Sequence, residues 1–502
     1  MTVGALIQLE NGNTDRMAFL TLNPQITHFK SVYKKYTNFS TQFITLQPIL
    51  SSSILSFDQD TKITFEIPRD GDAIRDIYFT LELPDIYSNS NYQFQWIKRI
   101  GEYIIRSVSL QIDTNQTVDT QYGEWFHANS ELTLDEGKKL GYYRMIGNET
   151  EMFDPANAPG NNGIYPSTGF APSILNRKIY VPLSFWFNKY SSMAFPLIAI
   201  QKTIMYITFT FRRLQECYTI IDYGNTGKRI KPSLSSHYIG NFINPINPNQ
   251  SSLFVNARLE VNNIFLDNEE RKRFALSTHE YLITQIQRIK QSYSTSTITL
   301  DLKDINKPVK ELVFMIRRSD MEDINEWSNY TNWNVPDIPP YSAGYINPYG
   351  PALTINNSNI IYYKNKNLLK SAVIRLLANE ITMGDVANND NPQGVRLNGK
   401  DAVFYNLMQN YNANVNLPAE GIYTYSFSLD NNSLQPIGAV NFSSINNKDM
   451  LLTLTPINPN ENMNNPAGTT YSSPYNYIIH VFGVNYDIFK IMGGMAGTMT
   501  AN

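Results

Sequence analysis

The chain of 502 residues has 41 Lys and Arg against 44 Asp and Glu, so it lacks the long-range positive field of a protein that wraps nucleic acid. Its single cysteine, Cys217, excludes an intramolecular disulfide and a multi-cysteine zinc site. Charged residues make up only 17% and aromatic residues 13%, which is typical of a large β-rich protein with extensive contact surfaces.

The amino-terminal residues 1–13 lack the basic segment and the long apolar segment of a signal peptide. The sequence contains no run of about 18 apolar residues, the length that a membrane-spanning helix needs. We therefore expect a protein without a transmembrane segment that is not secreted by the usual route and is made in a reducing compartment.

Alternation of apolar and polar residues predicts a series of short strands. In residues 62–67, for example, Ile63, Phe65 and Ile67 alternate with polar residues. The same pattern occurs in residues 76–83, 107–113, 205–211, 297–302, 311–316 and 423–429. Because the strands are joined by loops rich in Pro, Gly and Asn and not regularly by helices, antiparallel sandwiches or barrels are favoured over a parallel sheet.

Two segments have helical periodicity. Residues 123–134 place apolar side chains near the helical period. Residues 267–285 begin with Asp267 and Glu270 in the spacing of a capping box, and Phe274 and Tyr281 share one face. We expect both helices to lie against the edge of a sheet.

Long irregular stretches separate the strands, at residues 145–176, 222–252, 328–360 and 384–420. They are too long for hairpin turns, so we expect surface loops that project from the sandwiches. A break near residues 213–252 divides two strand-rich regions, each of a length common for all-β domains.

No catalytic motif is present. The five histidines are scattered, and His279-Glu280 starts a zinc-binding HExxH pattern that Ile283 leaves incomplete. Asp267, Glu269 and Glu270 could act as paired carboxylates in glycoside hydrolysis, but the basic residues 271–273 favour an ion-paired first helical turn. We therefore assign no catalytic, cofactor-binding or metal-binding residue, and we expect no enzyme activity and no cofactor.

Aromatic and basic groups also have structural explanations. Glu124-Trp125 and the Tyr-rich residues 339–351 could stack on sugar rings, but such residues in a large assembly are more often interface anchors. The basic pairs Lys34-Lys35, Arg212-Arg213 and Arg317-Arg318 form no dense patch, so we interpret them as solvated strand ends and expect no direct nucleic-acid partner.

Several blocks of sequence resemble one family. LNPQITHFKSVYKKYTNF at residues 22–39 is similar to a segment of the major capsid proteins of the nucleocytoplasmic large DNA viruses of eukaryotes. Further blocks resemble the same family in the same order, at residues 101–132, 180–201, 264–287, 308–314, 421–443 and 481–497. One departure is Asp113-Thr114-Asn115, where the family often has a glycine-containing turn; Asp and Asn also form turns well.

The resemblance implies an all-β double jelly roll, that is, two eight-stranded antiparallel β-sandwiches with a few short helices and long loops. On this basis we expect an N-terminal arm at residues 1–25, a first jelly roll at 26–215 and a second at 216–502. It also implies a structural major capsid protein that trimerises into pseudo-hexagonal capsomers, which tile the icosahedral shell of a large DNA virus.

The implied partners are two further copies in a homotrimer, neighbouring capsomers, and minor capsid proteins under the shell. The resemblance places the arm at the base of the capsomer, where it would bind minor capsid proteins or a neighbouring capsomer. The implied location is the virion, with assembly in the host cell cytoplasm. The alternative from the residues alone is a carbohydrate-binding or glycoside-cleaving β-sandwich protein.

Overall fold

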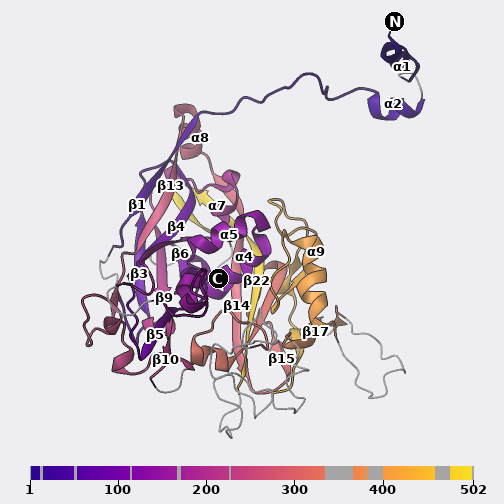
Figure 1. Cartoon of the computed structure of the whole chain (residues 1–502). Helices are drawn as coiled ribbons and strands as arrows, with labels where there is room; N and C mark the ends of the chain where they lie inside the picture. Colours follow the sequence, from indigo (N-terminus) through magenta and orange to yellow (C-terminus); the bar gives the residue numbers. More distant parts are fainter. Residues whose placement is uncertain are drawn as a thin grey trace, which may run out of the picture.

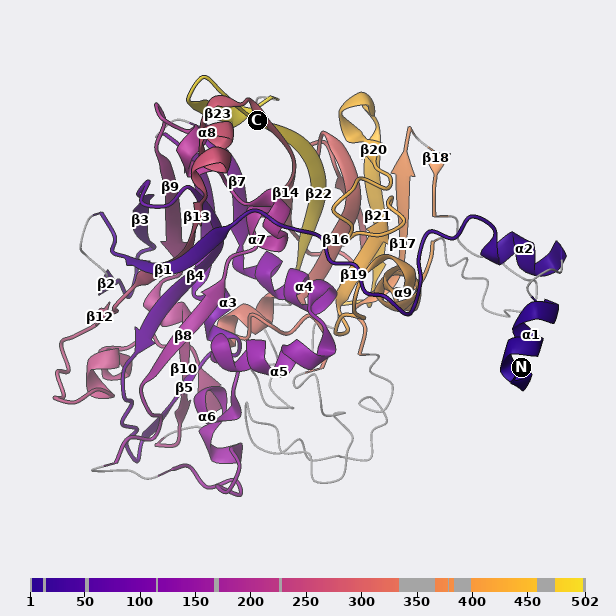
Figure 2. The ribbon, with the colours of Figure 1, turned by 90° about the horizontal axis from the view of Figure 1, so that it is seen from above.

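The computed structural model describes residues 2–11, 15–49, 54–113, 116–166, 171–224, 228–333, 366–377, 379–382, 399–457 and 475–499. These residues form two β-sandwiches that stand side by side, with an extended N-terminal arm that leaves one end of the first (Figures 1 and 2). All strand pairs among the described residues are antiparallel.

The first sandwich consists of two four-stranded sheets, in the orders β1-β13-β4-β8 and β3-β9-β6-β7. A three-stranded sheet, β11-β10-β5, and the pair β12-β2 extend it. The strands are β1 Phe39–Leu46, β2 Ile54–Leu55, β3 Thr61–Ile67, β4 Ala73–Leu83, β5 Tyr92–Trp96, β6 Ile105–Ile112, β7 Gln116–Tyr122, β8 Arg177–Pro182, β9 Met205–Phe211, β10 Tyr218–Asp222, β11 Lys228–Ile230, β12 Leu253–Phe254 and β13 Arg258–Leu266.

The second sandwich pairs a sheet of order β14-β22-β16-β19, to which β20 and β23 add, with a sheet of order β15-β21-β17-β18. The strands are β14 His279–Tyr293, β15 Thr297–Asp301, β16 Pro308–Arg318, β17 Leu369–Leu376, β18 Asn379–Glu380, β19 Ile422–Ser426, β20 Val440–Asn441, β21 Lys448–Leu454, β22 Tyr477–Met492 and β23 Met495–Thr498.

Short helices occupy the connections and the arm. They are α1 Val3–Asn11, α2 Asp15–Thr21, α3 Ile100–Tyr103, α4 Gly123–Thr133, α5 Glu136–Met145, α6 Thr150–Phe153, α7 Trp186–Lys189, α8 Asn268–Leu276 and α9 Gln409–Ala413. α4 and α7 lie on the side of the first sandwich that faces the second (Figure 2). No helix among the described residues is long and apolar enough to cross a membrane.

Aromatic rings fill the interior of each sandwich. In the first, Phe79 of β4 lies 4.6 Å from Phe209 of β9, measured between ring centroids, so the rings join the two facing sheets. In the second, Phe314 of β16 lies 5.3 Å from Tyr423 and packs into a core that includes Leu452 of the opposite sheet. This is the arrangement that period-two alternation requires, because each strand buries one face and leaves the other for solvent or neighbours.

The seven predicted strands are confirmed as β3, β4, β6, β9, β15, β16 and β19, although β19 ends at Ser426, before the end predicted at residue 429. The helix predicted at residues 123–134 is confirmed as α4. The helix predicted at 267–285 is wrong beyond residue 276: α8 ends there, and residues 279–285 belong to β14. Strand pairing decides this, because β14 aligns with β22 from His279 to Tyr293 and buries alternate residues such as Ile283 and Gln285.

The predicted loops contain more structure than expected. Residues 404–413, within the stretch at 384–420, form a turn of π-helix followed by α9. Residues 334–360 and 384–398 of the predicted loops lie outside the described residues.

The strand pairing differs from the domain boundary expected between residues 215 and 216. β13 lies between β1 and β4, and β10 pairs with β5, so residues 218–266 complete the first sandwich. The stretch at 222–252 resembles a linker in composition but packs on this sandwich: the Tyr218 hydroxyl donates to the carbonyl of His237 at 2.7 Å. We therefore propose a division between residues 267 and 278, the segment that contains α8.

Candidate functional site

The N-terminal arm exposes apolar side chains along its length. The described residues of the expected arm at 1–25 and the residues that follow it, up to residue 38, extend away from the first sandwich in both views (Figures 1 and 2). Phe29 is 98% exposed and Phe19 is 91% exposed, and α1 leaves Leu6, Ile7 and Leu9 in solvent. Contiguous exposed apolar residues of this kind usually mark a surface for another molecule. The arm is therefore a candidate binding segment.

The two sandwiches meet along a second surface, which we call the seam. Its apolar part joins α4 of the first sandwich, through Trp125 and Leu132, to β16 and β22 of the second, through Val313 and Phe482. Phe482 is fully buried, and its ring lies 5.5 Å from that of Trp125. Strand edges meet here too, because Gln285 Nε2 of β14 donates to the carbonyl of Val118 of β7 at 2.6 Å.

A buried ion pair lies beside this apolar contact. Arg212, which follows β9, donates from Nη2 to Glu124 Oε1 of α4 at 2.7 Å, and the two side chains are only 3% and 2% exposed. Arg288 of β14 lies 3.8 Å from the other carboxylate oxygen of Glu124. Burial alone would raise the pKa of Glu124, but Arg212 and the other nearby cations outweigh burial and lower it. Glu124 is therefore a carboxylate that both sandwiches stabilise.

The loop after β16 fastens the second sandwich onto the first. Trp327 Nε1 donates to the carbonyl of Glu216 at 2.9 Å, and Asn325 Nδ2 donates to the carbonyl of Tyr218 at 2.8 Å. Glu326 pairs with Arg229 of β11 at 2.9 Å. Because these contacts are buried and come from both main chain and side chain, they bind the second sandwich firmly to the first.

His480 of β22 is a buried neutral histidine in the seam. Neither ring nitrogen has a hydrogen-bond partner among the described residues, and the ring stacks on that of Phe482 at 6.3 Å. Burial lowers its pKa well below the usual value, Glu124 opposes this effect, and Arg317 of β16, with Lys290 and Arg288 of β14, adds to it. The imidazole therefore stays uncharged in the folded protein.

Replacing His480 by phenylalanine should flatten the acid side of the stability profile. Below pH 6.5 the unfolded chain binds a proton at this histidine, whereas the folded chain does not. The free energy of unfolding therefore decreases as the pH is lowered, by about 1 kcal/mol from pH 6.5 to pH 5.5. His480→Phe removes this contribution and keeps a ring against Phe482. Urea unfolding at pH 7.5, 6.5 and 5.5 measures the difference; equal slopes for the variant and the natural protein would contradict the prediction.

The structure does not bring the sequence candidates for catalysis together. Asp267 caps α8 by accepting a hydrogen bond from the amide of Asn268 at 2.8 Å, and Arg271 pairs with Asp72 of the loop before β4 at 2.9 Å. His279 and Glu280 lie in β14, not on a helix. Among the residues that the structure describes, no group of three or more His, Cys, Asp or Glu side chains could hold a metal ion.

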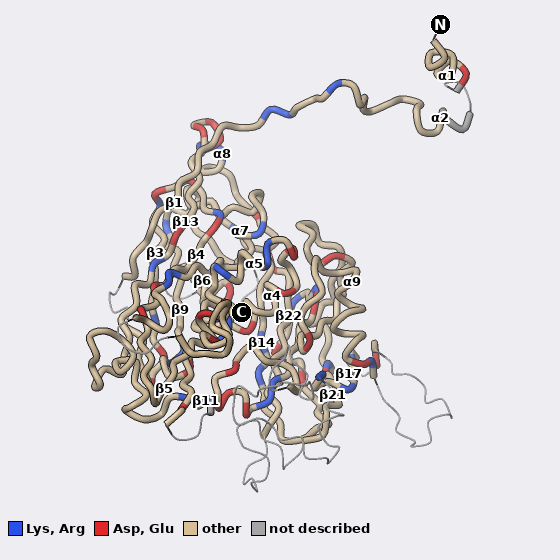
Figure 3. Tube along the Cα trace, in the orientation of Figure 1, with Lys and Arg blue, Asp and Glu red and all other residues tan. Residues whose placement is uncertain are grey.

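The aromatic and basic candidates fall into two groups. Glu124 and Trp125 are buried in the seam and are not open to a sugar, and residues 339–351 lie outside the described residues. The interpretation of Arg212 and Arg317-Arg318 as solvated strand ends is wrong, because Arg212 is 3% exposed and the other two are fully buried. Arg212 pairs with Glu124, 88 positions earlier, whereas Arg318 pairs with Asp320, only two residues later. Figure 3 shows both signs of charge interspersed over the two sandwiches.

Family models match both halves of the chain. Residues 27–267 match the N-terminal part of the major capsid protein, and residues 270–497 match the major capsid protein of large eukaryotic DNA viruses. The chain belongs to the major capsid protein family of large eukaryotic DNA viruses. The junction between the two matches, at residues 267–270, coincides with the division that the strand pairing indicates.

Individual relatives align over nearly the full chain. The major capsid protein of Phaeocystis pouchetii virus is 27% identical, over 99% of this chain and 100% of the relative. That of Paramecium bursaria Chlorella virus 1 is 26% identical, over 96% of each chain. A chain in the quasi-atomic model of the PBCV-1 virus capsid superposes with a TM-score of 0.66 at 24% identity, over 95% of this chain and 100% of that one.

The expected fold is confirmed as a double jelly roll, with each sandwich forming one jelly roll. As a family member, this capsid protein is a structural component of a virion and not an enzyme. The glycoside-cleaving alternative is therefore wrong. Trp125, one of the aromatic residues that suggested it, is buried in the seam.

Proposed function

We propose that this capsid protein trimerises into a pseudo-hexagonal capsomer that tiles an icosahedral shell. Three chains with two jelly rolls each give six similar walls around one axis, and heterologous contacts close such a ring. The seam supports this role most directly, because a tile keeps its shape only if its two sandwiches move as one body. The near-complete alignment with a chain of the PBCV-1 capsid model adds to the support.

Mass measurement and negative-stain imaging of the purified protein test the capsomer. The expected result is a particle of three times the chain mass of 57.4 kDa with a hexagonal outline. A stable monomer, or a dimer without that outline, would contradict the proposal. In purified virions the protein should dominate the stained gel, whereas a minor component that shares the fold would be scarce.

We further propose that the N-terminal arm, residues 1–25, lies at the base of the capsomer and binds minor capsid proteins or a neighbouring capsomer. In the structure the arm leaves the α8 end of the first sandwich, at the opposite end from β5 and β10 (Figure 1). Its exposed apolar residues need a partner in the assembled particle. The proposed site of assembly is the host cell cytoplasm, and no direct contact with nucleic acid is proposed.

Deleting residues 1–25 should separate capsomer formation from shell formation. The arm residues described are mostly exposed, so their loss should change the free energy of unfolding by no more than about 0.5 kcal/mol. We expect the trimer to persist and the yield of closed shells to fall sharply when the variant is expressed with the minor capsid proteins. Mass measurement and electron microscopy give the two results; loss of the trimer would instead place the arm in the trimer interface.

A further inference from the structure

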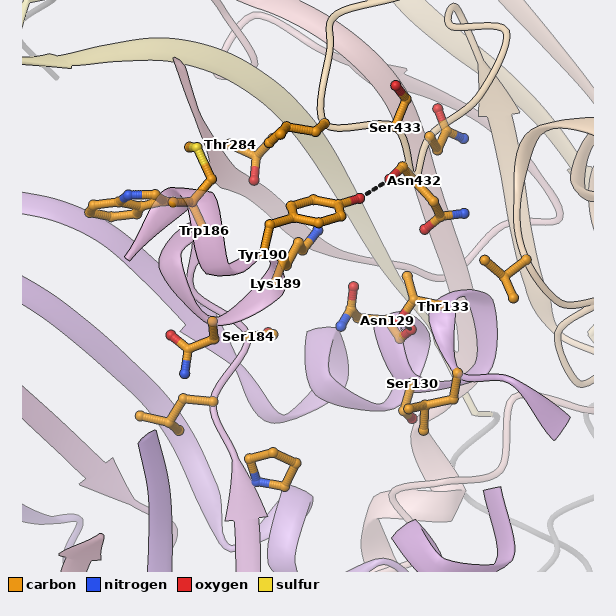
Figure 4. Close-up of a pocket in the computed structure, with 18 of the residues that line it drawn as sticks. Asn129, Ser130, Thr133, Ser184, Trp186, Lys189, Tyr190, Thr284, Asn432 and Ser433 are labelled. Carbon is orange, nitrogen blue, oxygen red and sulfur yellow. Dashed lines mark hydrogen bonds between the residues drawn. The ribbon is translucent and has the colours of Figure 1, made fainter. Parts of the chain in front are cut away.

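A pocket of about 410 Å³ lies between the two jelly rolls. Its lining comes from α4, α7 and the residues between β8 and α7 on one side, and from β14, β16, β22 and the loop at 431–434 on the other (Figure 4). This volume lies within the range of sites that enclose small molecules, which is roughly 300–1,000 Å³. It belongs neither to the arm nor to the buried contacts of the seam.

Much of the pocket wall is apolar. Phe126 of α4 and Trp186 of α7 are almost fully buried and form part of the lining. Leu183, Met193 and Leu282 contribute aliphatic or thioether surface. Such a wall favours a ligand with a hydrocarbon body, because burying that body removes apolar surface from water on both sides.

One cation in the pocket has no counter-ion in contact. Lys189, at the end of α7, lines the pocket with its side chain partly in solvent, and its ammonium group has no hydrogen bond or ion pair with any residue that the structure describes. Lys310, the other lysine in the lining, differs: it donates to the carbonyl of Asn431 at 2.8 Å and lies 3.9 Å from Glu311.

The surroundings of Lys189 leave its charge uncompensated. Partial desolvation by the pocket wall lowers its pKa to about 8, Lys310 adds to the effect, and Glu311 and Asp119 only partly oppose it. The lysine is still mostly protonated at pH 7, so an anion beside it would relieve this unfavourable balance. Near it, Asn129 and Thr284 line the pocket without a side-chain hydrogen bond to any described residue, and they can contact a polar headgroup (Figure 4).

We propose that this pocket binds one small amphipathic carboxylate per chain, with the carboxylate paired to the Lys189 ammonium and the hydrocarbon body against Phe126, Leu183 and Met193. The charge of Lys189 selects a monoanion, and the apolar wall selects against a hydrophilic acid. A sugar acid would place hydroxyl groups against these apolar side chains, where they would lose their hydrogen bonds to water.

Calorimetric titration of the purified, assembled protein with octanoate tests this site. We expect saturable binding of one octanoate per chain. Octan-1-ol has the same chain without the charge, octylammonium has the opposite charge, and glucuronate has the charge without the apolar body. Each should bind at least about tenfold more weakly, because each lacks either the charge-assisted contact or the buried chain.

Variants test the role of Lys189. Lys189→Gln should weaken octanoate binding about tenfold or more, and Lys189→Arg should retain most of it. Lys202→Gln, which removes an exposed lysine outside the pocket, is the matched control and should bind as the natural protein does. Thermal unfolding of each variant checks that it folds.

Three results would overturn the proposal. Absence of saturable octanoate binding below its micelle concentration would remove the site. Equal binding of octanoate to a folded Lys189→Gln protein would remove the role of the lysine. Glucuronate binding as tight as octanoate would show that the ligand is a hydrophilic acid and not an amphiphile.

Discussion

Replacing Arg212 by methionine should lower the free energy of unfolding by about 3–5 kcal/mol, the usual cost when one partner of a buried ion pair is removed. Methionine fills much of the same space but leaves Glu124 without the cation 2.7 Å from its carboxylate. Arg288, at 3.8 Å, is too distant to replace that contact fully. Urea unfolding at pH 7.5 and the thermal midpoint measure the loss.

The neighbouring residue provides the control. Arg213 is 47% exposed and lies 3.7 Å from Asp60, so Arg213→Met should cost no more than about 1 kcal/mol. A second variant that combines Arg212→Met with Glu124→Leu should recover part of the lost stability, because no unpaired carboxylate then remains in the seam. If the double variant is no more stable than Arg212→Met alone, the unpaired carboxylate is not the cause of the loss and the prediction fails.

The strands could be predicted because their information is local. Period-two alternation placed β9 at residues 205–211 to the residue, since each strand buries one side within a sandwich. The prediction of a helix at 267–285 was wrong because the deciding contact is not local. Phe274 and Tyr281 match a helical period, but the segment after Ser277 pairs with β22, about 200 residues later in the sequence. Tertiary pairing overrode a weak local preference there.

The seam could not be predicted from the sequence. Arg212, Glu124 and Arg288 are 76 to 164 positions apart, and each has neighbours of ordinary polarity. Whether these three residues meet depends on how α4 packs against the second sandwich, and no rule based on sequence spacing predicts that packing. The same holds for Lys189, whose pocket needs elements from both jelly rolls. The family resemblance predicted the fold, but it assigned no role to these residues.

The Phe482→Ala variant should also lose about 3–5 kcal/mol of unfolding free energy, through cavity formation and not through charge. Phe482 is fully buried, and its ring touches α4 through Trp125 at 5.5 Å and lies 6.4 Å from Tyr122. Removing the ring leaves a void between two rigid sandwiches, neither of which can collapse into it, so the full packing loss remains.

Two further variants separate this packing effect from a general effect of losing an aromatic ring. Phe254 of β12 is 66% exposed, so Phe254→Ala should change the unfolding free energy by no more than about 0.5 kcal/mol. Phe482→Leu keeps most of the apolar volume and should lose clearly less than Phe482→Ala. Urea unfolding of the three variants gives the order; a Phe482→Ala protein as stable as Phe254→Ala would show that the apolar part of the seam does not hold the two jelly rolls together.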